Sequence, residues 1–345
     1  MASQSRLKVA SGEYYSEYYG HRVADLTKVL EGLRSERPEA STIWLAGDSS
    51  LDNKHWLFPD TMHSQAASRP RVMMDTTATA AACNGYGHVL TPPRMVKDVN
   101  YFVNWELERQ GVDAYSLNCA REESTIQDRE GERGLMPQDL FIKDNIRPGD
   151  TLVVSVGGND IALRPTPATI VSMAMLLYLS THTMIEYGVA PGLWYFQNMY
   201  RNRVQAYVEK LVSKTKPKRV IINMLYFLDE TPGGSWADPT LARLGYDNDP
   251  TKLQTLIRTI YATATKRIRI AGTEVIALPL FEIMDGKDSL DYDQRVEPSV
   301  QGGSKMGKFF VGTIVARDAA IANGRRAEEP ASNSPAPPAR ATRGT

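Results

Sequence analysis

The sequence predicts an α/β fold, a doubly wound three-layer sandwich around a central parallel sheet of about five strands. Three observations support this fold class. Short β-branched runs alternate with longer amphipathic runs through the middle of the chain. Three of the short runs are continuously apolar, as expected for strands whose two faces are both covered. The chain has 345 residues, which suffices for one large core.

Each expected element has its own local signal. The expected strands are apolar or β-branched runs, at residues 42–47 (TIWLAG), 112–118, 151–156 (TLVVSV), 219–227 (RVIINMLYF) and 274–280 (EVIALPL). The expected helices have apolar side chains at helical spacing, at residues 23–34, 95–109, 138–145, 169–187, 199–214, 250–270 and 304–323. Strand and helix alternate, so parallel pairing with helices on both faces follows.

Three regions follow from this pattern. We expect residues 1–38 to be an N-terminal helical extension and residues 39–323 the α/β domain, with a lid-like insertion at about 54–94. Residues 324–345 are expected to be a disordered tail. The tail has four prolines and no apolar side chain larger than alanine, so burial cannot offset the entropy lost on ordering.

Composition narrows the function classes. Lys and Arg number 40, as do Asp and Glu, and this balance argues against a nucleic-acid binder held by bulk charge. The two cysteines, Cys83 and Cys119, are too few for a disulfide framework or a cysteine zinc site. Residues 1–20 lack the apolar run of a signal peptide, so a cytoplasmic protein is expected. No glycine-rich phosphate loop and no metal-ligand spacing occur, so neither a cofactor nor a metal is expected.

The most apolar stretch, at residues 170–179, is about half the length needed to span a bilayer. A helix that is apolar all round is usually buried, and we expect burial here. The alternative is a lid or face that contacts lipid, because an aromatic cluster at residues 194–196 follows as it would in an aromatic-tipped loop.

Polar motifs follow the first and third expected strands, where the chemistry of a parallel sheet is found. Gly47-Asp48-Ser49 would place a serine hydroxyl at a tight strand-to-helix turn, although a plain helix cap explains the same residues. In Gly157-Gly158-Asn159-Asp160, the glycines permit a close turn and the asparagine amide can donate to an oxyanion. An ordinary glycine turn is the alternative. The two motifs together indicate a reaction site more specifically than either motif alone.

In this order, the motifs resemble those of the SGNH (GDSL-type) hydrolase superfamily over roughly residues 40–315. The residues that carry the resemblance are 47–49 for the first block, 118–120 for the start of the second, 157–160 for the third and 296–299 for the fifth. The resemblance implies a doubly wound sheet of about five parallel strands and a small-molecule ester or acyl substrate. It implies that Ser49 is the nucleophile and that its N–H and the Asn159 side chain are oxyanion donors.

Two positions depart from the family pattern. Gln294 and Glu297 occupy the places of the family's Asp and His, so Glu297 is the candidate base. An unperturbed glutamate has a pKa of about 4.3, and Arg295 would lower that pKa further if residues 295–297 were extended. An ion-pair cluster that only shapes the pocket is the alternative role of Glu297. The glycine of the second block falls on Glu123, which gives the expected oxyanion site an acidic neighbour.

Further residues are assigned by their position beside these motifs. We expect the substrate to contact the following side chains and backbone: Asp48, Asp52, Asn53, Gly158 and Glu123. Residues 233–236, Gly-Gly-Ser-Trp, follow the fourth strand and would lie beside the same cleft. Three histidines of the expected insertion are alternative bases, His55, His63 and His88. Cys119 is expected to be a buried core residue.

Two function hypotheses follow. The first is an atypical serine esterase or acyl hydrolase that attacks an ester through Ser49, with Glu297 or a lid histidine as the base. The second is a catalytically degenerate domain of the same fold that binds a small molecule, lipid or protein. We favour the first because Ser49, Asn159 and the glycine turn are all present and only the proton-transfer group has changed.

Overall fold

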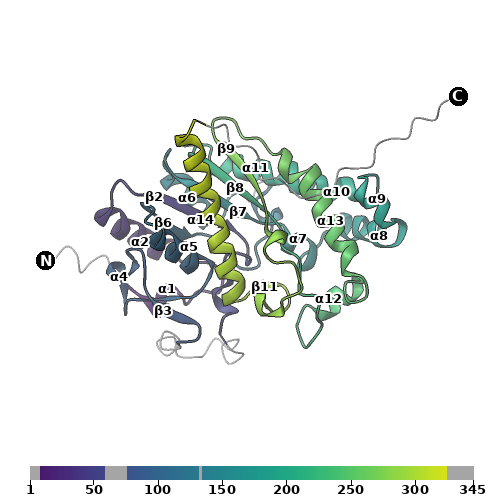
Figure 1. The fold of residues 1–345 in the computed structure, drawn as a ribbon, viewed down its shortest axis with the longest axis horizontal. Coiled ribbons are helices and arrows are strands. Elements are labelled where there is room, and N and C mark those ends of the chain that lie inside the picture. Colours follow the sequence, from purple (N-terminus) through teal and green to yellow (C-terminus); the bar gives the residue numbers. More distant parts are fainter. Residues whose placement is uncertain (1–7, 59–75, 132–133, 325–345) are drawn as a thin grey trace.

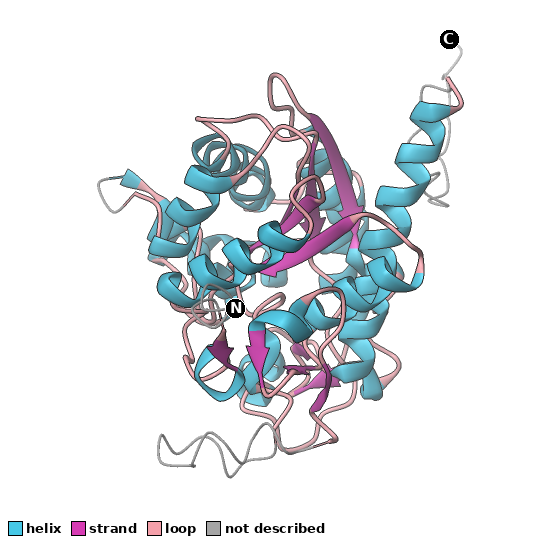
Figure 2. Ribbon diagram, turned by 90° about the vertical axis from the view of Figure 1, so that its left-hand side faces the viewer, coloured by secondary structure: helices cyan, strands magenta, loops and turns pink. Residues whose placement is uncertain are grey.

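The computed structural model describes residues 8–58, 76–131 and 134–324. Five parallel strands form the central sheet, as the sequence predicts, and Figure 2 shows them between helices. The strands are β2 (Ser41–Gly47), β6 (Ala114–Asn118), β7 (Thr151–Ser155), β8 (Arg219–Met224) and β9 (Glu274–Pro279). Their order in the sheet is β6-β2-β7-β8-β9. The predicted fold class is therefore confirmed.

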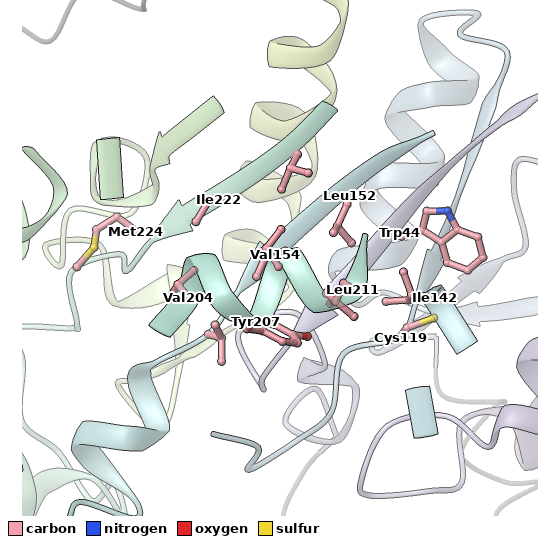
Figure 3. Close-up of a cluster of buried hydrophobic side chains, with 14 of the residues drawn as sticks. Trp44, Cys119, Ile142, Leu152, Val154, Val204, Tyr207, Leu211, Ile222 and Met224 are labelled. Atoms are coloured by element: carbon pink, nitrogen blue, oxygen red, sulfur yellow. The ribbon is translucent and has the colours of Figure 1, made fainter. Parts of the chain in front are cut away.

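The two faces of the sheet bury different side chains because strand residues alternate in direction. Ile43 and Leu45 of β2 pack in the core beneath α5 (Val99–Arg109) and α14 (Val300–Ala322). Trp44 of β2 belongs to the core on the opposite face, which also contains residues of the helices α2 (Val23–Glu36), α6 (Pro137–Asn145) and α11 (Val204–Leu211). Figure 3 shows part of this second core, including Trp44.

Several helices begin or end where local hydrogen bonds or turns direct them. The expected helix at 95–109 begins at Val99, because β5 (Arg94–Val96) pairs with β3 (Thr79–Ala81) and Asp98 caps the helix. The expected helix at 304–323 begins at Val300, where the Ser299 side chain accepts from two backbone N–H groups. The expected helix at 199–214 opens as a π-helix over Met199–Arg203 before α11.

A group of helices gathers at one end of the molecule, away from the N-terminal elements (Figure 1). They are α8 (Pro167–Leu179), α9 (His182–Glu186), α10 (Leu193–Asn198), α12 (Asp238–Arg243) and α13 (Pro250–Thr263). The expected helix at 169–187 is divided between α8 and α9, because Thr181 caps the second helix. The expected helix at 250–270 ends at Thr263, before a short 3₁₀ turn.

The expectation that residues 170–179 are buried is wrong for one face of α8. Thr169, Ser172, Met173 and Leu176 face inward, whereas Ile170 and Leu179 are among the exposed side chains, and Tyr178 is 77% exposed. The helix is apolar on every side, so its hydropathy could not specify which stripe would face the protein.

None of the helices in the described ranges is long and apolar enough to cross a membrane. The expected disordered tail lies outside the described residues, apart from Gly324, as does the middle of the expected insertion, residues 59–75.

Candidate active site

The order of the strands places a crevice at the carboxyl ends of β2 and β7. The first strand of this sheet in the chain is β2. The next strand, β6, lies on one side of it, and the following strands, β7, β8 and β9, lie on the other, so the strand order reverses between β2 and β7. In open α/β sheets, ligands bind outside the strand ends at such a switch point. The Ser49 motif follows β2 and the Asn159 motif follows β7, so the topology brings together the two motifs that the sequence singles out.

The turn that carries Ser49 is fixed by its neighbours. Gly47 has φ +135°, and a Cβ atom at this position would lie 1.7 Å from the Ser155 carbonyl oxygen of β7. The Asp48 N–H donates to that same carbonyl at 3.0 Å. The buried Arg129 guanidinium donates to the Gly47 carbonyl at 3.0 Å. Only glycine fits this close approach, and the turn that follows is held from both sides.

The Ser49 hydroxyl donates a hydrogen bond to a carboxylate. Its Oγ lies 3.0 Å from Oε1 of Glu297, and both residues are 5% exposed. The second carboxylate oxygen of Glu297, Oε2, is buried without a hydrogen-bond partner among the described residues. A serine hydroxyl and an acceptor for its proton therefore lie in contact within the protein.

The pKa of Glu297 is raised to about 8, mainly by burial and also by the nearby charges of Asp48, Asp293 and Asp52, against the hydrogen bond from Ser49, which lowers it. The expected lowering by Arg295 is wrong. Arg295 has φ +66°, so residues 295–297 are not extended. Its guanidinium instead bonds Asp238 at 2.7 Å and Asp247 at 2.8 Å.

Glu297 is positioned by a short strand and by hydrogen bonds to its neighbours. It lies in β11 (Glu297–Pro298), which pairs with β10 (Tyr292–Asp293). The Asn53 amide donates to the Pro298 carbonyl at 2.8 Å, and the Tyr226 hydroxyl donates to the Val296 carbonyl at 2.6 Å. These bonds hold the backbone on both sides of the carboxylate.

Asn159 lies in α7 (Gly158–Ala162), which begins after Gly157. Gly157 has φ +117°, and a Cβ atom there would lie 2.9 Å from the Tyr200 ring. The Asn159 amide nitrogen donates one hydrogen bond to the Ser124 carbonyl at 3.1 Å. Because an amide group has two N–H donors, this bond fixes its orientation and leaves one donor for a ligand.

A single cavity of about 120 Å³ joins these groups. Its polar lining includes Asp48, Ser49, Asn159 and Glu297, and Gly158 contributes backbone. Burial raises the pKa of Asp48 to about 6, although that carboxylate accepts bonds from the Ser50 hydroxyl and N–H.

Three of the expected substrate contacts do not line this cavity. Asp52 accepts from the backbone N–H groups of Gly20 and Glu122, both at 2.9 Å, and pairs with buried Lys54. Asn53 bridges β11 to α5, since its side-chain oxygen also accepts from the Val99 N–H at 3.1 Å. Asp52 and Asn53 therefore connect backbone segments that surround the cavity.

Glu123 also does not line the cavity. It has φ +57°, a conformation that favours glycine, and its Oε1 accepts from the Tyr18 hydroxyl at 3.3 Å. The resemblance predicted a glycine at this position, and the backbone keeps the conformation suited to glycine.

Sequence reasoning missed Glu122. This residue is buried, and its Oε2 accepts from the Trp56 indole at 3.2 Å. Burial and then the charge of Glu297 raise its pKa well above the ordinary range. The signal was the pair of adjacent glutamates, but nothing in the sequence indicates which of the two faces inward after the strand ends.

The alternative bases lie elsewhere or outside the described residues. His55 Nε2 lies 2.8 Å from the Glu17 carbonyl oxygen, and His88 Nδ1 lies 3.3 Å from the Glu36 carboxylate. Neither contact involves Ser49. His63 lies outside the described residues. Cys119 is fully buried, which raises the pKa of its thiol. No cluster of three His, Cys, Asp or Glu side chains suited to a metal occurs in the described ranges.

No protein-family model and no curated protein matches the chain. Solved structures that match it are described as esterases and lipases. One is a lipase from a goat rumen metagenome, at 11% identity and a TM-score of 0.41, covering 79% of this chain and 96% of that chain.

Another is an acetyl xylan esterase from Geobacillus stearothermophilus, at 14% identity and a TM-score of 0.39, covering 79% of this chain and 94% of that chain. A third is a GDSL-like lipase from Bacteroides ovatus, at 11% identity and a TM-score of 0.34, covering 80% of this chain and 53% of that chain. With TM-scores below 0.5, these likenesses carry no weight for function beside the geometry of the site.

Proposed function

We propose that the protein is an atypical serine esterase in which Ser49 attacks the ester and Glu297 is the general base. The observation that carries the proposal is the 3.0 Å hydrogen bond from Ser49 Oγ to Glu297 Oε1 within the cavity. The raised pKa of Glu297, about 8, makes its carboxylate a stronger base than an ordinary glutamate and brings it close to neutral pH.

The reaction proceeds in two halves. Ser49 Oγ bonds to the ester carbonyl carbon as its proton passes to Glu297, and the carbonyl electron pair moves onto oxygen. The Ser49 N–H and the Asn159 amide donate to that oxyanion. When the oxyanion collapses, the bond to the alcohol oxygen breaks and Glu297 protonates the leaving alcohol. Water then gives Glu297 a proton as its oxygen bonds to the acyl carbon. When this second oxyanion collapses, the bond to Ser49 Oγ breaks, Glu297 returns the proton to Ser49 Oγ and the acid is released.

The second candidate is a degenerate domain that binds a small molecule without cleaving it. The observation that favours it is the same pKa, because a Glu297 protonated at neutral pH cannot accept the proton of Ser49. The two candidates differ in whether Ser49 is chemically activated.

Covalent labelling tests this difference. The purified wild type, Ser49→Ala and Glu297→Gln would be treated with a fluorophosphonate probe, and the labelled peptide identified by mass spectrometry. We expect labelling of Ser49 in the wild type and loss of labelling in both variants. Labelling that survives Glu297→Gln would redirect the search to a histidine, and a wild type without label would support the binding domain.

The exposed face of α8, α9 and α10 supports a second proposal, that the protein contacts lipid at its periphery. Ile170, Leu179 and Trp194 are each more than half exposed there. Residues 165–200 contain a single side chain of the Asp, Glu, Lys and Arg types, Glu186. The same helices also contribute Met173 and Phe196 to the lining of the cavity. An exposed apolar face that adjoins the site and carries one carboxylate, Glu186, suits a lipid surface better than water.

We further propose that the protein works in the cytoplasm. Both of its cysteines, Cys83 and Cys119, are buried free thiols, which suits a reducing compartment. Fractionation of cells that produce the chain at native level would test this location.

A further inference from the structure

The cavity beside Ser49 continues into an apolar chamber. Its wall is formed by side chains from α8, α10, α12 and α13 and by residues that follow β8. The apolar side chains that the argument uses are Met173, Phe196, Leu241, Leu256, Ile257 and Ile260. All six are buried, so they present a continuous apolar surface to whatever enters.

The charges of the cavity lining are confined to the reaction site. Among the described residues that line the cavity, the charged types are Asp48 and Glu297, which lie next to Ser49 or in contact with it. Beyond the reaction site, the polar side chains of the lining are Tyr200, Tyr226, Trp236 and Thr240. These are too few to satisfy the polar atoms of a sugar or a charged group, which makes burial of such a group unfavourable. The chamber therefore selects a hydrocarbon group.

Its size limits the length of that group. The cavity measures about 120 Å³. An apolar cavity of about 150 Å³ lined by similar side chains holds benzene, which has six carbons. A straight chain of roughly four to six carbons matches the chamber on this scale, and a chain of about sixteen exceeds it.

We propose that the chamber binds the acyl chain of the substrate and makes the enzyme selective for esters of fatty acids of roughly four to six carbons. This inference rests on the proposed esterase function. The acyl group stays bonded to Ser49 through both halves of the reaction, whereas the alcohol leaves after the first half. A largely enclosed chamber suits the part that stays.

Chain-length profiles test the selectivity. We would measure kcat/KM for p-nitrophenyl acetate, butyrate, hexanoate and palmitate, which share one leaving group. Each buried methylene contributes about fourfold in binding, so hexanoate should exceed acetate by at least about tenfold and palmitate should fall below hexanoate. A second series of acetate esters with alcohols of increasing length should show no comparable rise. Equal rates across acyl chains, or a rise in the alcohol series alone, would overturn the inference.

Substitutions in the chamber provide a second test of the chain-length selectivity. Ile257→Trp fills space in the chamber and should lower kcat/KM for hexanoate at least tenfold more than kcat/KM for acetate. Met173→Ala enlarges the chamber and should move the optimum to a longer chain, which keeps the test informative if the tryptophan variant does not fold. The matched control is Ile321→Trp, because Ile321 is 55% exposed and does not line the cavity. Unchanged profiles in both chamber variants would contradict the assignment.

Failure of this inference is distinguishable from failure of the esterase proposal. If no ester is cleaved, calorimetry with hexanoate on Ser49→Ala reports on the chamber alone, and binding that Ile257→Trp weakens at least tenfold would still support the hydrocarbon site. If esters are cleaved and Ser49 is labelled but chain length has no effect, the esterase proposal stands and the chamber assignment falls.

Discussion

In the proposed mechanism, Glu297 is the base that accepts the proton of Ser49. The carboxylate accepts the hydroxyl hydrogen bond directly, and its burial compensates for the low intrinsic basicity of a glutamate. Because of the same burial, the contribution of Glu297 to the free energy of unfolding depends on pH. A carboxyl group whose pKa rises on folding stabilises the folded state only while it is protonated.

The variant Glu297→Gln should show both effects. General-base catalysis contributes about 10²- to 10⁴-fold, so kcat should fall by that factor. The folded pKa of about 8 lies above the ordinary 4.5, so wild type loses stability as pH rises between these values. The variant should therefore gain stability over wild type from pH 5 to pH 9, by more than about 1 kcal/mol. Denaturant unfolding at both pH values measures this, and a constant difference would contradict the raised pKa.

Asn159 offers a separate test of the oxyanion site. Loss of one donor from such a site costs about 10²- to 10³-fold in kcat, and Asn159→Ala should show this loss with little change in KM. Asn202→Ala, at an exposed asparagine on the π-helical turn, is the matched control. An unchanged kcat in Asn159→Ala would remove the side chain from the oxyanion site.

At this scale, sequence reasoning named the main polar residues but misjudged their surroundings. Ser49, Asn159 and Glu297 could be named because they follow strand ends or match a motif, and all three line one cavity. The raised pKa of Glu297 could not be predicted, since it comes mainly from burial of the carboxyl group. The left-handed turn at Arg295 could not be predicted either, and the Arg295 guanidinium bonds Asp238 and Asp247 instead of Glu297. The sequence predicted substrate contacts at Asp52 and Asn53, because nothing local indicates that their side chains form hydrogen bonds with backbone groups instead.

The elements that hold the site are the turn after β2 and the short strand β11. Gly47 lets the two backbones approach, and the Ser50 and Ser155 hydroxyls join the turn to β7 at 2.7 Å. The turn that carries Ser49 therefore depends on the close approach that Gly47 allows.

A pair of glycine substitutions tests that dependence. Gly47→Ala should destabilise the fold by about 2 kcal/mol or more, because the added Cβ meets the Ser155 carbonyl and the φ value is unsuited to alanine. Gly312→Ala is the control, since this glycine lies inside α14 with no atom within 4 Å of the added Cβ. It should stabilise by about 0.5–1 kcal/mol. Equal Tm values for the two variants would contradict the close approach.

Helices and strands could be predicted from the sequence where the pattern of apolar residues was strong. All five central strands follow apolar or β-branched runs, and α2 and α6 begin within one residue of their expected starts. Boundaries failed where a side chain decides them, as at the caps Asp98, Thr181 and Ser299. The two-residue strands, including β11, have no pattern long enough to detect.

At the scale of the whole molecule, the helices α8 and α10 contribute side chains both to the outer apolar face and to the lining of the inner chamber. Sequence reasoning predicted the layered sheet and the edge at which the motifs meet. It did not predict that α8 would expose Tyr178 and Leu179, because that orientation depends on which helices lie beside it in space.

Association with lipid vesicles tests the outer face. The full chain should sediment with phosphatidylcholine vesicles, and Leu179→Asp should reduce the bound fraction at least fivefold, because a charge then lies on the apolar surface. Hydrolysis of soluble p-nitrophenyl butyrate should stay unchanged in this variant. Leu290→Asp, at a leucine that is 71% exposed away from these helices, is the control. Absence of binding by wild type, or self-association through this face in solution, would contradict the lipid proposal.

The most direct test of the account is the pH dependence of Ser49 labelling by a fluorophosphonate. We predict that the labelling rate of wild type rises with pH with a midpoint near 8, as Glu297 loses its proton and becomes able to accept that of Ser49. Glu297→Gln should remove the rise, and Glu122→Gln should retain it. A labelling rate that does not depend on pH, or one that rises equally in Glu297→Gln, would contradict the role of Glu297 as the base.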